Sequence, residues 1–354
     1  MMLEGKRVLI TGGTGSLGKV LTRRILRNEF GCPAKVVVFS RDEEKQHAMR
    51  LQYLRHRVAT DEVIYHNFEK LLEFRIGDVR DYHSVASVLR EVDIVFNAAA
   101  MKQVPTCEYF PYEGVRTNID GAENIVRAIR ELRLPVEEVV GISTDKACKP
   151  VNVMGMTKAI QERILLSANI LCPDTRFICV RYGNVLASRG SVIPLFHSQI
   201  RAGGPVTITT PEMTRFLLSL EEAVDTIFAA VREALPGEIF VPDAPAARMT
   251  DVARALIGDR PIDIKMIGMR PGEKVHEILI SEEECRRSFQ CNGFYGIRPI
   301  LPELDARPVW EPPPFRTEYS SALNLMTMAE TEALLRKHRL MTTDVEPGEV
   351  ELLR

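Results

Sequence analysis

The first half of the chain alternates short apolar runs with longer stretches whose apolar residues recur at helical spacing. This alternation is typical of βαβ units, which build a parallel sheet with helices on both faces. The class is therefore α/β, with a Rossmann-type doubly wound parallel sheet. Strands are predicted at residues 8–11, 35–39, 72–76, 94–97, 139–143 and 176–181, and helices at residues 17–28, 83–90, 114–132 and 153–171.

After residue 182 the alternation fades into a mixture of short strands and helices. We expect residues 1–182 to bind a dinucleotide and residues 183–354 to form a smaller α/β part that binds substrate, with some of its segments returning to the first part. Here the pattern predicts helices at residues 191–201, 220–233 and 328–339, a strand at 238–241 and an extended proline-rich segment at 302–314. Earlier in the chain, residues 56–70 are predicted to form an inserted loop or helix without an assigned role.

Composition excludes several classes of function. With 46 basic and 48 acidic residues, the net charge of -2 gives no field that would attract nucleic acid or an anionic membrane. No apolar run approaches the roughly 20 residues of a membrane span, and no signal peptide is evident, so a cytoplasmic protein is expected. Seven cysteines without a CxxC pair argue against a disulfide framework, and the scattered histidines predict no metal site.

A glycine-rich turn, TGGTGSLG at residues 11–18, joins the first predicted strand to the first predicted helix. Gly12 permits the tight turn, Gly15 leaves room for a pyrophosphate, and Gly18 allows close packing. The helix N-terminus would face the phosphates, whereas the alternative is a purely structural turn. The dinucleotide-binding residues predicted here are Gly12, Thr14, Gly15, Ser16, Leu17 and Gly18.

The end of the second predicted strand indicates which dinucleotide is bound. Ser40 stands where an NAD-specific enzyme places the acid that binds the ribose 2′-hydroxyl. Ser40 and Arg41 can instead donate hydrogen bonds and positive charge to a 2′-phosphate, which predicts NADP. The alternative is that Arg41 is a solvated charge beside a helix cap at Asp42. Further cofactor-binding residues are expected after the third and fourth strands, at Asp78, Val79, Ala98, Ala99 and Ala100.

Two segments with polar, titratable side chains are predicted to face one cleft. STDKA at residues 143–147 closes the fifth strand, and MGMTK at residues 154–158 opens the following helix. Met154 and Lys158 lie four residues apart and so share one helical face.

At these residues the sequence resembles the extended short-chain dehydrogenases and, among them, the UDP-N-acetylglucosamine 4,6-dehydratases of bacterial polysaccharide biosynthesis. The resemblance implies a redox-neutral cycle in which bound NADP+ takes a hydride from C4, water leaves across C5 and C6, and the hydride returns to C6. The product would be a 4-keto-6-deoxy sugar nucleotide. The motifs that carry the resemblance are residues 11–18, 40–43 (SRDE), 97–105 (NAAAMKQVP), 143–147, 154–158, 181–191 (RYGNVLASRGS), 213–216 (MTRF) and 270–274 (RPGEK).

The resemblance also implies roles for the catalytic residues. Asp145 would be the acid at the C6 hydroxyl and Lys146 the base at C5, while Thr144 would bond near the C4 oxygen. Lys158 resembles the lysine that binds the nicotinamide ribose. We expect burial beside Lys158 and the oxidised nicotinamide to lower the pKa of Lys146, which must be neutral to act as a base.

Met154 departs from the pattern of most of the superfamily, which has at this position the tyrosine that accepts the sugar hydroxyl proton. A thioether cannot accept it, so a different group must. A subset of these dehydratases resembles this chain in carrying methionine, and the chain is expected to belong to that subset. The alternative is a non-catalytic NADP-binding regulator.

On the substrate side, the resemblance implies that Arg215 and Arg270 hold the diphosphate and ribose, with Glu273 in the same motif as Arg270. Guanidinium groups match phosphate oxygens well. Asn184 would reach the diphosphate or hexose, and Lys102 would line the sugar pocket. As isolated residues, these are more often solvated surface charges.

The exact reaction stays open at this point. A nucleotide-sugar epimerase without net dehydration, or a dehydratase that also inverts C5, would use the same cofactor and a similar lysine.

The helices at residues 114–132 and 153–171 carry apolar faces that in this superfamily often pair between subunits, so a homo-oligomer, a dimer or larger, is expected.

Overall fold

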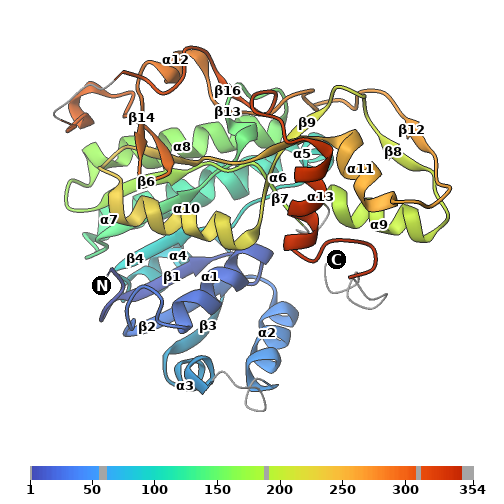
Figure 1. Cartoon of the computed structure of the whole chain (residues 1–354). Coiled ribbons are helices and arrows are strands. Elements are labelled where there is room, and N and C mark those ends of the chain that lie inside the picture. The colour runs from blue at the N-terminus through green and yellow to red at the C-terminus, as the bar shows by residue number, and fades with distance from the viewer. Residues whose placement is uncertain (1, 56–61, 187–190, 308–311, 345–354) are drawn as a thin grey trace.

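The computed structural model describes residues 2–55, 62–186, 191–307 and 312–344. Its central element is a nine-stranded sheet with the order β14-β15-β10-β6-β5-β4-β1-β2-β3 (Figure 1). The strands from β3 to β10 pair parallel, and β15 and β14 add an antiparallel edge. The first six strands are β1 (Arg7–Thr11), β2 (Lys35–Ser40), β3 (Leu72–Ile76), β4 (Ile94–Asn97), β5 (Glu138–Ile142) and β6 (Arg176–Val180).

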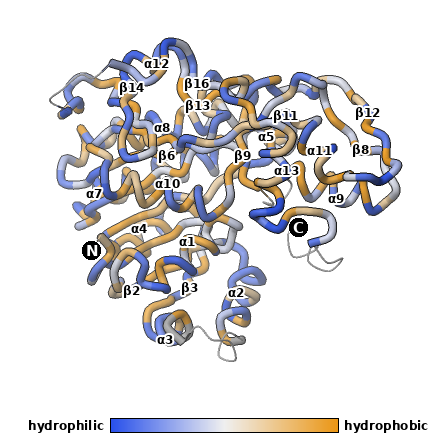
Figure 2. Tube along the Cα trace, viewed as in Figure 1, coloured by the Kyte–Doolittle hydropathy of each residue, from blue (hydrophilic) through white to orange (hydrophobic). Residues whose placement is uncertain are grey.

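The predicted α/β class with a doubly wound parallel sheet is confirmed, and each of the six predicted strands lies within one residue of its prediction. Helices on both faces bury the central strands, which is why those strands read as continuous apolar runs. Figure 2 shows this apolar centre. One face is covered by α4 (Tyr82–Leu89), α7 (Gly121–Leu132) and α8 (Val153–Leu171), and the other by α1 (Ser16–Leu26) and α10 (Leu220–Glu233).

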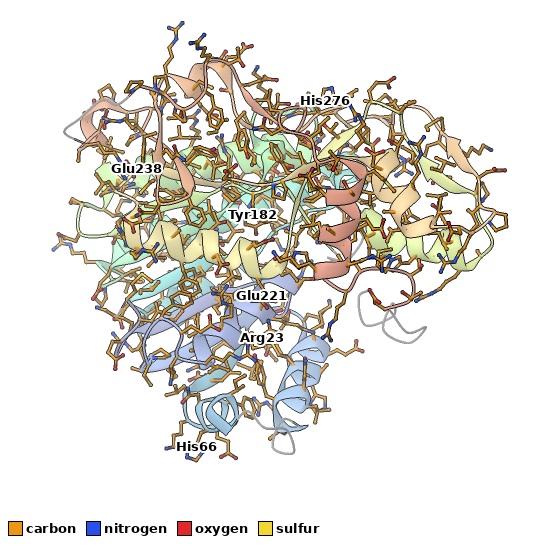
Figure 3. The ribbon with its side chains drawn as sticks, in the orientation of Figure 1. Arg23, His66, Tyr182, Glu221, Glu238 and His276 are labelled. Carbon is orange, nitrogen blue, oxygen red and sulfur yellow. The ribbon has the colours of Figure 1, made fainter. Side chains whose placement is uncertain are left out.

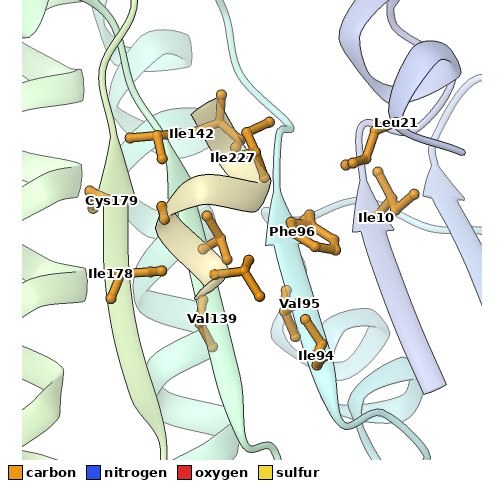
Figure 4. Packing of buried hydrophobic residues seen from close by; sticks show 14 of the residues in the cluster. Ile10, Leu21, Ile94, Val95, Phe96, Val139, Ile142, Ile178, Cys179 and Ile227 are labelled. Carbon is orange, nitrogen blue, oxygen red and sulfur yellow. The ribbon is translucent and has the colours of Figure 1, made fainter. Parts of the chain in front are cut away.

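Some segments expected in the smaller part return to the main sheet. The strand predicted at residues 238–241 is β10 (Ile239–Pro242), which pairs parallel with β6. The predicted helix 220–233 is α10, which packs on α1 and β10. Figure 4 shows its Ile227 lying over the strands that carry Phe96 and Ile142. The hairpin of β14 (Ser288–Cys291) and β15 (Phe294–Ile297), which the sequence pattern did not indicate, joins the same sheet.

The smaller part has its own apolar cluster, to which Ile193, Phe196, Leu256 and Leu335 contribute buried side chains. Helices α9, α11 and α13 and two small sheets, β11-β9-β7 and β12-β8, surround it, whereas the third small sheet, β13-β16, packs on the main core (Figure 1). The elements are α9 (Val192–Arg201), α11 (Met249–Ile257), α13 (Met328–Lys337), β7 (Asn184–Val185), β8 (Val206–Ile208), β9 (Thr214–Leu218), β11 (Ala246–Arg248), β12 (Ile264–Met266), β13 (Ile278–Ile280) and β16 (Tyr319–Ser320).

Two predicted segments differ from their expectation in part. The helix predicted at residues 114–132 is α6 (Pro111–Gly114), a π-helical segment η2 (Val115–Asp120) and then α7. The proline-rich segment 302–314 begins with a 3-10 turn, η4 (Pro302–Leu304), because proline at the first helical position loses no hydrogen bond. Its residues 308–311 lie outside the described residues.

The segment predicted as an inserted loop or helix at residues 56–70 contains the helix α3 (Glu62–Leu71), while residues 56–61 lie outside the described part. None of the described helices is both long enough and apolar enough to cross a bilayer. The remaining elements are α2 (Glu43–Arg55), α5 (Val104–Tyr109), α12 (Glu282–Cys285) and the 3-10 turn η3 (Asp145–Ala147).

Candidate active site

A cleft of about 1060 Å³ lies at the carboxyl ends of β1, β2, β4 and β5, between the main sheet and the smaller part. Ligands of open α/β sheets bind at this edge. The cleft brings together nearly all of the predicted site residues. Those on its lining are Gly12, Thr14, Gly15, Ser16, Leu17, Gly18, Ser40, Arg41, Ala98, Ala99, Ala100, Lys102, Thr144, Lys146, Met154, Lys158, Asn184, Arg215, Arg270 and Glu273.

Three predicted residues are not on the lining. Asp145 lies fully buried beneath it. Asp78 forms an ion pair with Arg80 at 2.6 Å and lies 3.7 Å from the guanidinium of Arg41, so it touches the cofactor end of the cleft only through Arg41. Val79 is buried in the core.

The glycine-rich turn has the geometry of a phosphate cradle. Gly12 adopts a φ of +65°, and a Cβ there would lie 2.8 Å from the backbone of Ala99. A Cβ on Gly18 would lie 2.5 Å from Gly13. Gly15 is the N-cap of α1 and has no side-chain capping bond. The backbone N–H groups of this helix start are thus suited to an anion such as a pyrophosphate.

The end of β2 lines the same cleft. The hydroxyls of Ser40 and Thr14 lie 3.0 Å apart, and the Asp42 N–H donates to the Ser40 hydroxyl at 3.2 Å. Lys45, which pairs with Asp42, also lines the cleft and brings a second cation beside Arg41. The sequence analysis did not identify Lys45. The only feature of the sequence that could have indicated it is its position near the start of α2, a helix that was not predicted.

Asp145 and Lys146 stand in η3, directly after β5. Lys146 Nζ lies 3.0 Å from Asp145 Oδ1, and Thr144 Oγ1 donates to the same oxygen at 2.9 Å. Asp145 Oδ2 has no partner among the described residues. Burial raises the pKa of Asp145 and Glu277 adds to this, while Lys146 and Thr144 oppose it. The pKa of Asp145 is therefore shifted upward, which is the direction that an acid requires.

The structure corrects our expectation for Lys146. Burial alone would lower the pKa of Lys146, but the nearby carboxylates of Asp145 and Glu277 outweigh it, so the pKa is raised. The Lys158 amine does not lower the pKa of Lys146 as expected, because the Lys158 amine donates to the Ile142 carbonyl and to Gln161 Oε1. Lys146 is therefore an ammonium in the chain as it stands.

Glu277 is a second residue of this cleft that sequence reasoning missed, after Lys45. It lies directly before β13, and its side chain is only 2% exposed. Its Oε1 is 3.1 Å from Lys146 Nζ and 3.7 Å from Arg215 Nε. Burial alone would raise the pKa of Glu277, but the positive charges of Lys146 and Arg215 lower it by more than burial raises it. Glu277 therefore carries a negative charge. The available signal was an acid just before the apolar run ILI, three residues after RPGEK.

The start of α8 holds Met154 and Lys158 against the cleft. Asn152 caps this helix by accepting the Gly155 N–H at 2.8 Å. Met154 is buried on the lining. Lys158 is fully buried, and burial lowers its pKa to about 8.

The end of the cleft formed by β9 and by residues 270–277 combines cations with buried acceptors. Arg215 Nη1 donates to the carbonyls of Thr214 at 2.7 Å and Val275 at 3.1 Å, which fixes its guanidinium. Thr209 donates to Glu273 at 3.1 Å. Buried polar atoms without a partner among the described residues are Asn184 Oδ1, Ser191 Oγ and Glu277 Oε2 on the lining, and Thr210 Oγ1 beside it. Buried acceptors are rarely left unpaired, so they fit a hydroxyl-rich ligand.

Comparison with known proteins identifies the family. The sequence profile described as "Polysaccharide biosynthesis protein" matches residues 8–299. The chain belongs to this family. A UDP-glucose 4-epimerase of Rickettsia bellii (strain OSU 85-389) is 44% identical to it over 301 residues, which is 84% of each chain.

Solved structures agree with this membership. The X-ray structure of Pen from Bacillus thuringiensis superposes with a TM-score of 0.83 at 33% identity, covering 96% of this chain and all of that one. DesIV from Streptomyces venezuelae, a dTDP-glucose 4,6-dehydratase solved with NAD and TYD, shares the fold at 19% identity, with a TM-score of 0.63 over 76% of this chain and 86% of its own. The polysaccharide biosynthesis family member described here is an NAD(P)-dependent nucleotide-sugar enzyme of the extended short-chain dehydrogenase class.

Proposed function

We propose that this protein is a nucleotide-sugar 4,6-dehydratase that uses NADP and acts on UDP-N-acetylglucosamine. The observation that carries the proposal is the contact of Lys146 with the buried Asp145, 3.0 Å apart at the floor of the cleft. A dehydratase needs one base and one acid on adjacent carbons of the sugar. Adjacent residues in one tight turn supply both.

The elimination can be written with these residues alone. When bound, NADP+ would supply the oxidation by accepting a hydride from C4 and later returning it, while the C4 hydroxyl proton passes to water in the cleft because the Met154 thioether cannot accept it. The resulting 4-ketone makes the C5 proton acidic, and Lys146 removes that proton. The C5–H electrons form a C5–C6 double bond as the C6–O bond breaks. The departing oxygen takes the proton of Asp145 and leaves as water.

The pair reaches its reactive state without gaining or losing a proton. A proton moving from Lys146 to Asp145 along the 3.0 Å hydrogen bond converts an ammonium and a carboxylate into a neutral amine and a carboxylic acid. Those are the base and the acid that the elimination requires. The raised pKa of Asp145, caused mainly by burial, favours this transfer, although the raised pKa of Lys146 opposes it.

NADP is supported by the side chains around Ser40. Ser40 itself carries no charge that would repel a 2′-phosphate, and Arg41 and Lys45 bring two cations to the lining. We expect Arg41→Ala to weaken NADP binding about tenfold or more, since charge-assisted bonds are worth about 1.5–3 kcal/mol, and to leave NAD binding unchanged. Titration of both coenzymes measures this, with Arg75→Ala as control; equal weakening of both would contradict it.

A UDP-glucose 4-epimerase is the second candidate, because the Rickettsia bellii relative bears that name. A 4-epimerase oxidises C4, turns the keto sugar over and reduces it on the other face. It needs neither a base at C5 nor an acid at C6. The Asp145–Lys146 pair therefore favours the dehydratase.

The test is incubation of the purified chain with UDP-N-acetylglucosamine or UDP-glucose in D2O, followed by mass spectrometry and proton NMR. A dehydratase gives a product 18 mass units lighter, apart from one deuterium gained at C5. An epimerase gives the C4 epimer without water loss or solvent deuterium. If NADP binds and neither product forms, the dehydratase proposal fails. The H4–H5 geometry of a reduced product distinguishes retention from inversion at C5.

We also infer a homo-oligomer that pairs through α8 and the α5–α6 region. Large apolar side chains are exposed there at Met156, Ile160, Tyr109, Phe110 and Tyr112. Contiguous exposed apolar patches mark association surfaces. Light scattering of the parent chain and of an Ile160→Glu variant tests this. We expect the variant to have a lower mass than the parent chain. A monomeric mass for the parent chain would contradict the proposal.

A further inference from the structure

We propose that Glu277 is a positioning residue for Lys146: it holds the amine by a hydrogen bond and sets the pH at which the Asp145–Lys146 pair is reactive. The inference rests on the proposed dehydratase function. Its basis is the short contact between Glu277 Oε1 and Lys146 Nζ, at 3.1 Å within the buried floor of the cleft.

The backbone of Glu277 is fixed on both sides. Its N–H donates to Ser321 Oγ at 2.9 Å, and its carbonyl accepts the Ser321 N–H at 2.8 Å. Ser321 in turn bonds to Thr214 of β9, which also contacts His276. The carboxylate of Glu277 is thus presented to the cleft by a closed network that ties β13 to β9.

The charges around Glu277 come from three elements. Lys146 and Asp145 face it from η3, Arg215 from β9, and Lys274 from the segment before β13. Asp145 and Glu277 therefore share Lys146, while Arg215 gives Glu277 a second cation that does not depend on Lys146. Glu277 stays paired when Lys146 becomes neutral.

This arrangement orients the amine. A neutral amine has two N–H donors and one lone pair. Transfer of the proton to Asp145 leaves the lone pair of Lys146 Nζ facing Asp145. Rotation about the Cε–Nζ bond then turns the lone pair to the cleft, where the C5 proton must be removed, and again places an N–H at Glu277 Oε1, 3.1 Å away. Without Glu277, the amine could turn its lone pair away from the sugar.

Glu277 also affects how the rate of water loss depends on pH, because it shifts the pKa of Asp145 and the pKa of Lys146 in the same direction. Its negative charge stabilises the ammonium of Lys146 and opposes ionisation of Asp145, so it raises both pKa values. Removing that charge must lower both. The whole bell-shaped profile of water loss against pH should then move to lower pH, because its limbs report a base that must be neutral and an acid that must be protonated.

The test uses Glu277→Gln, which keeps an acceptor of the same shape and loses the charge. We expect both limbs of kcat against pH to move about one unit or more towards acid, as is usual for loss of a charge within 4–6 Å. Glu277→Asp keeps the charge but lengthens the contact. We expect it to lower kcat about tenfold or more while the limbs stay in place, since a positioned base contributes about 10²–10⁴-fold.

Glu273→Gln is the matched control, because Glu273 is another carboxylate on the lining and bonds to Thr209 instead of Lys146. We expect it to change KM without moving the limbs. Coenzyme binding by each variant reports that it is folded.

The outcomes separate the two proposals. If the unmodified chain gives no water loss and no deuterium at C5, the dehydratase function fails before Glu277 is tested. If the unmodified chain is active and Glu277→Gln lowers kcat equally at all pH values, Glu277 is merely structural and the inference is overturned. If Glu277→Gln does not fold, Glu277→Asp decides: stationary limbs with a lower kcat support the inference, whereas an unchanged kcat contradicts it.

Discussion

Met154 carries a specific consequence for how the first proton leaves the sugar. A thioether accepts protons poorly, so in the proposed function the methionine fills space beside the sugar and coenzyme and transfers no proton. Leucine has a similar volume and shape and is tolerated at buried methionine positions, with losses below about 1.5 kcal/mol. We expect Met154→Leu to keep kcat within about threefold. Steady-state rates of water loss measure this, and a loss of a hundredfold would show that the sulfur takes part.

Lys158 makes the stability of the fold depend on pH in a direction that can be predicted. Burial lowers its pKa from the usual 10.5 to about 8. Between these values the unfolded chain binds more protons than the folded chain, so folding becomes more favourable as pH rises through this window. The difference is about 3 kcal/mol at about 1.36 kcal/mol per pKa unit.

The measurement is urea unfolding of the parent chain and of Lys158→Met at pH 7.5 and at pH 10.5. The difference in unfolding free energy should shift by about 3 kcal/mol in favour of the parent chain at the higher pH. Other groups titrate equally in both chains and cancel. If the difference in unfolding free energy between the two chains is the same at both pH values, burial does not lower the pKa of Lys158.

Single residues also show where sequence reasoning ends. The glycine turn and the Asp145–Lys146 pair were predictable because motif and strand end coincide in the sequence. Glu277 could not be placed beside Lys146 in this way, because 131 positions separate them in sequence and only the pairing of β13 with β16 and the contact of β13 with η3 bring them together. The expected direction of the Lys146 pKa was wrong because the adjacent Asp145 and the distant Glu277 together outweigh the effect of burial.

At the scale of elements, the start of α8 must lie close against η3. Gly155 permits this, since a Cβ there would lie 2.2 Å from the Lys146 carbonyl oxygen, a backbone atom that cannot move aside alone. Alanine normally stabilises a helix relative to glycine by about 1 kcal/mol. Here we expect Gly155→Ala to destabilise the fold by about 1–3 kcal/mol, as overpacking does, and to lower activity by displacing Lys146.

Arg163→Ala is the control for this substitution, because Arg163 lies on the same helix, its side chain is exposed and it is not among the apolar residues of the proposed subunit contact. Thermal unfolding and rates of water loss are measured for both variants. Full activity of Gly155→Ala would show that α8 and η3 can separate without cost to the site.

Elements were predictable to different degrees. The central strands of the first half are buried on both faces and therefore stand out as apolar runs. Helix α2 was missed because its apolar residues form no stripe. The π-helical segment η2 could not be predicted, since the buried side chain of Asn118 within it bonds to Met101 and Thr157, which are distant in sequence.

At the scale of the whole molecule, the coenzyme-binding part depends on residues far beyond its own strands. Helix α10 covers the face of the sheet that α1 begins to cover, and Phe228 on it stacks on Phe30 with ring centroids 3.4 Å apart. Arg23 and Arg24 of α1 form ion pairs with Glu221 of α10, and Figure 3 labels Arg23 and Glu221 at this contact. Strand β10 then pairs with β6 and closes its open edge.

We therefore expect a fragment of residues 1–182 to be insoluble and unable to bind NADP, because it would expose both an apolar sheet face and the edge of β6. In the full chain, Phe228→Ala should lower the free energy of unfolding by about 3–5 kcal/mol and lower the temperature at which coenzyme is released. Ile300→Ala, at an exposed apolar residue outside the proposed subunit contact, should do neither. Coenzyme fluorescence and circular dichroism during heating measure both effects. A soluble fragment 1–182 that binds NADP would show instead that α10 and β10 are additions to an independent domain, and the substrate-binding part would then be free to move as a separate body.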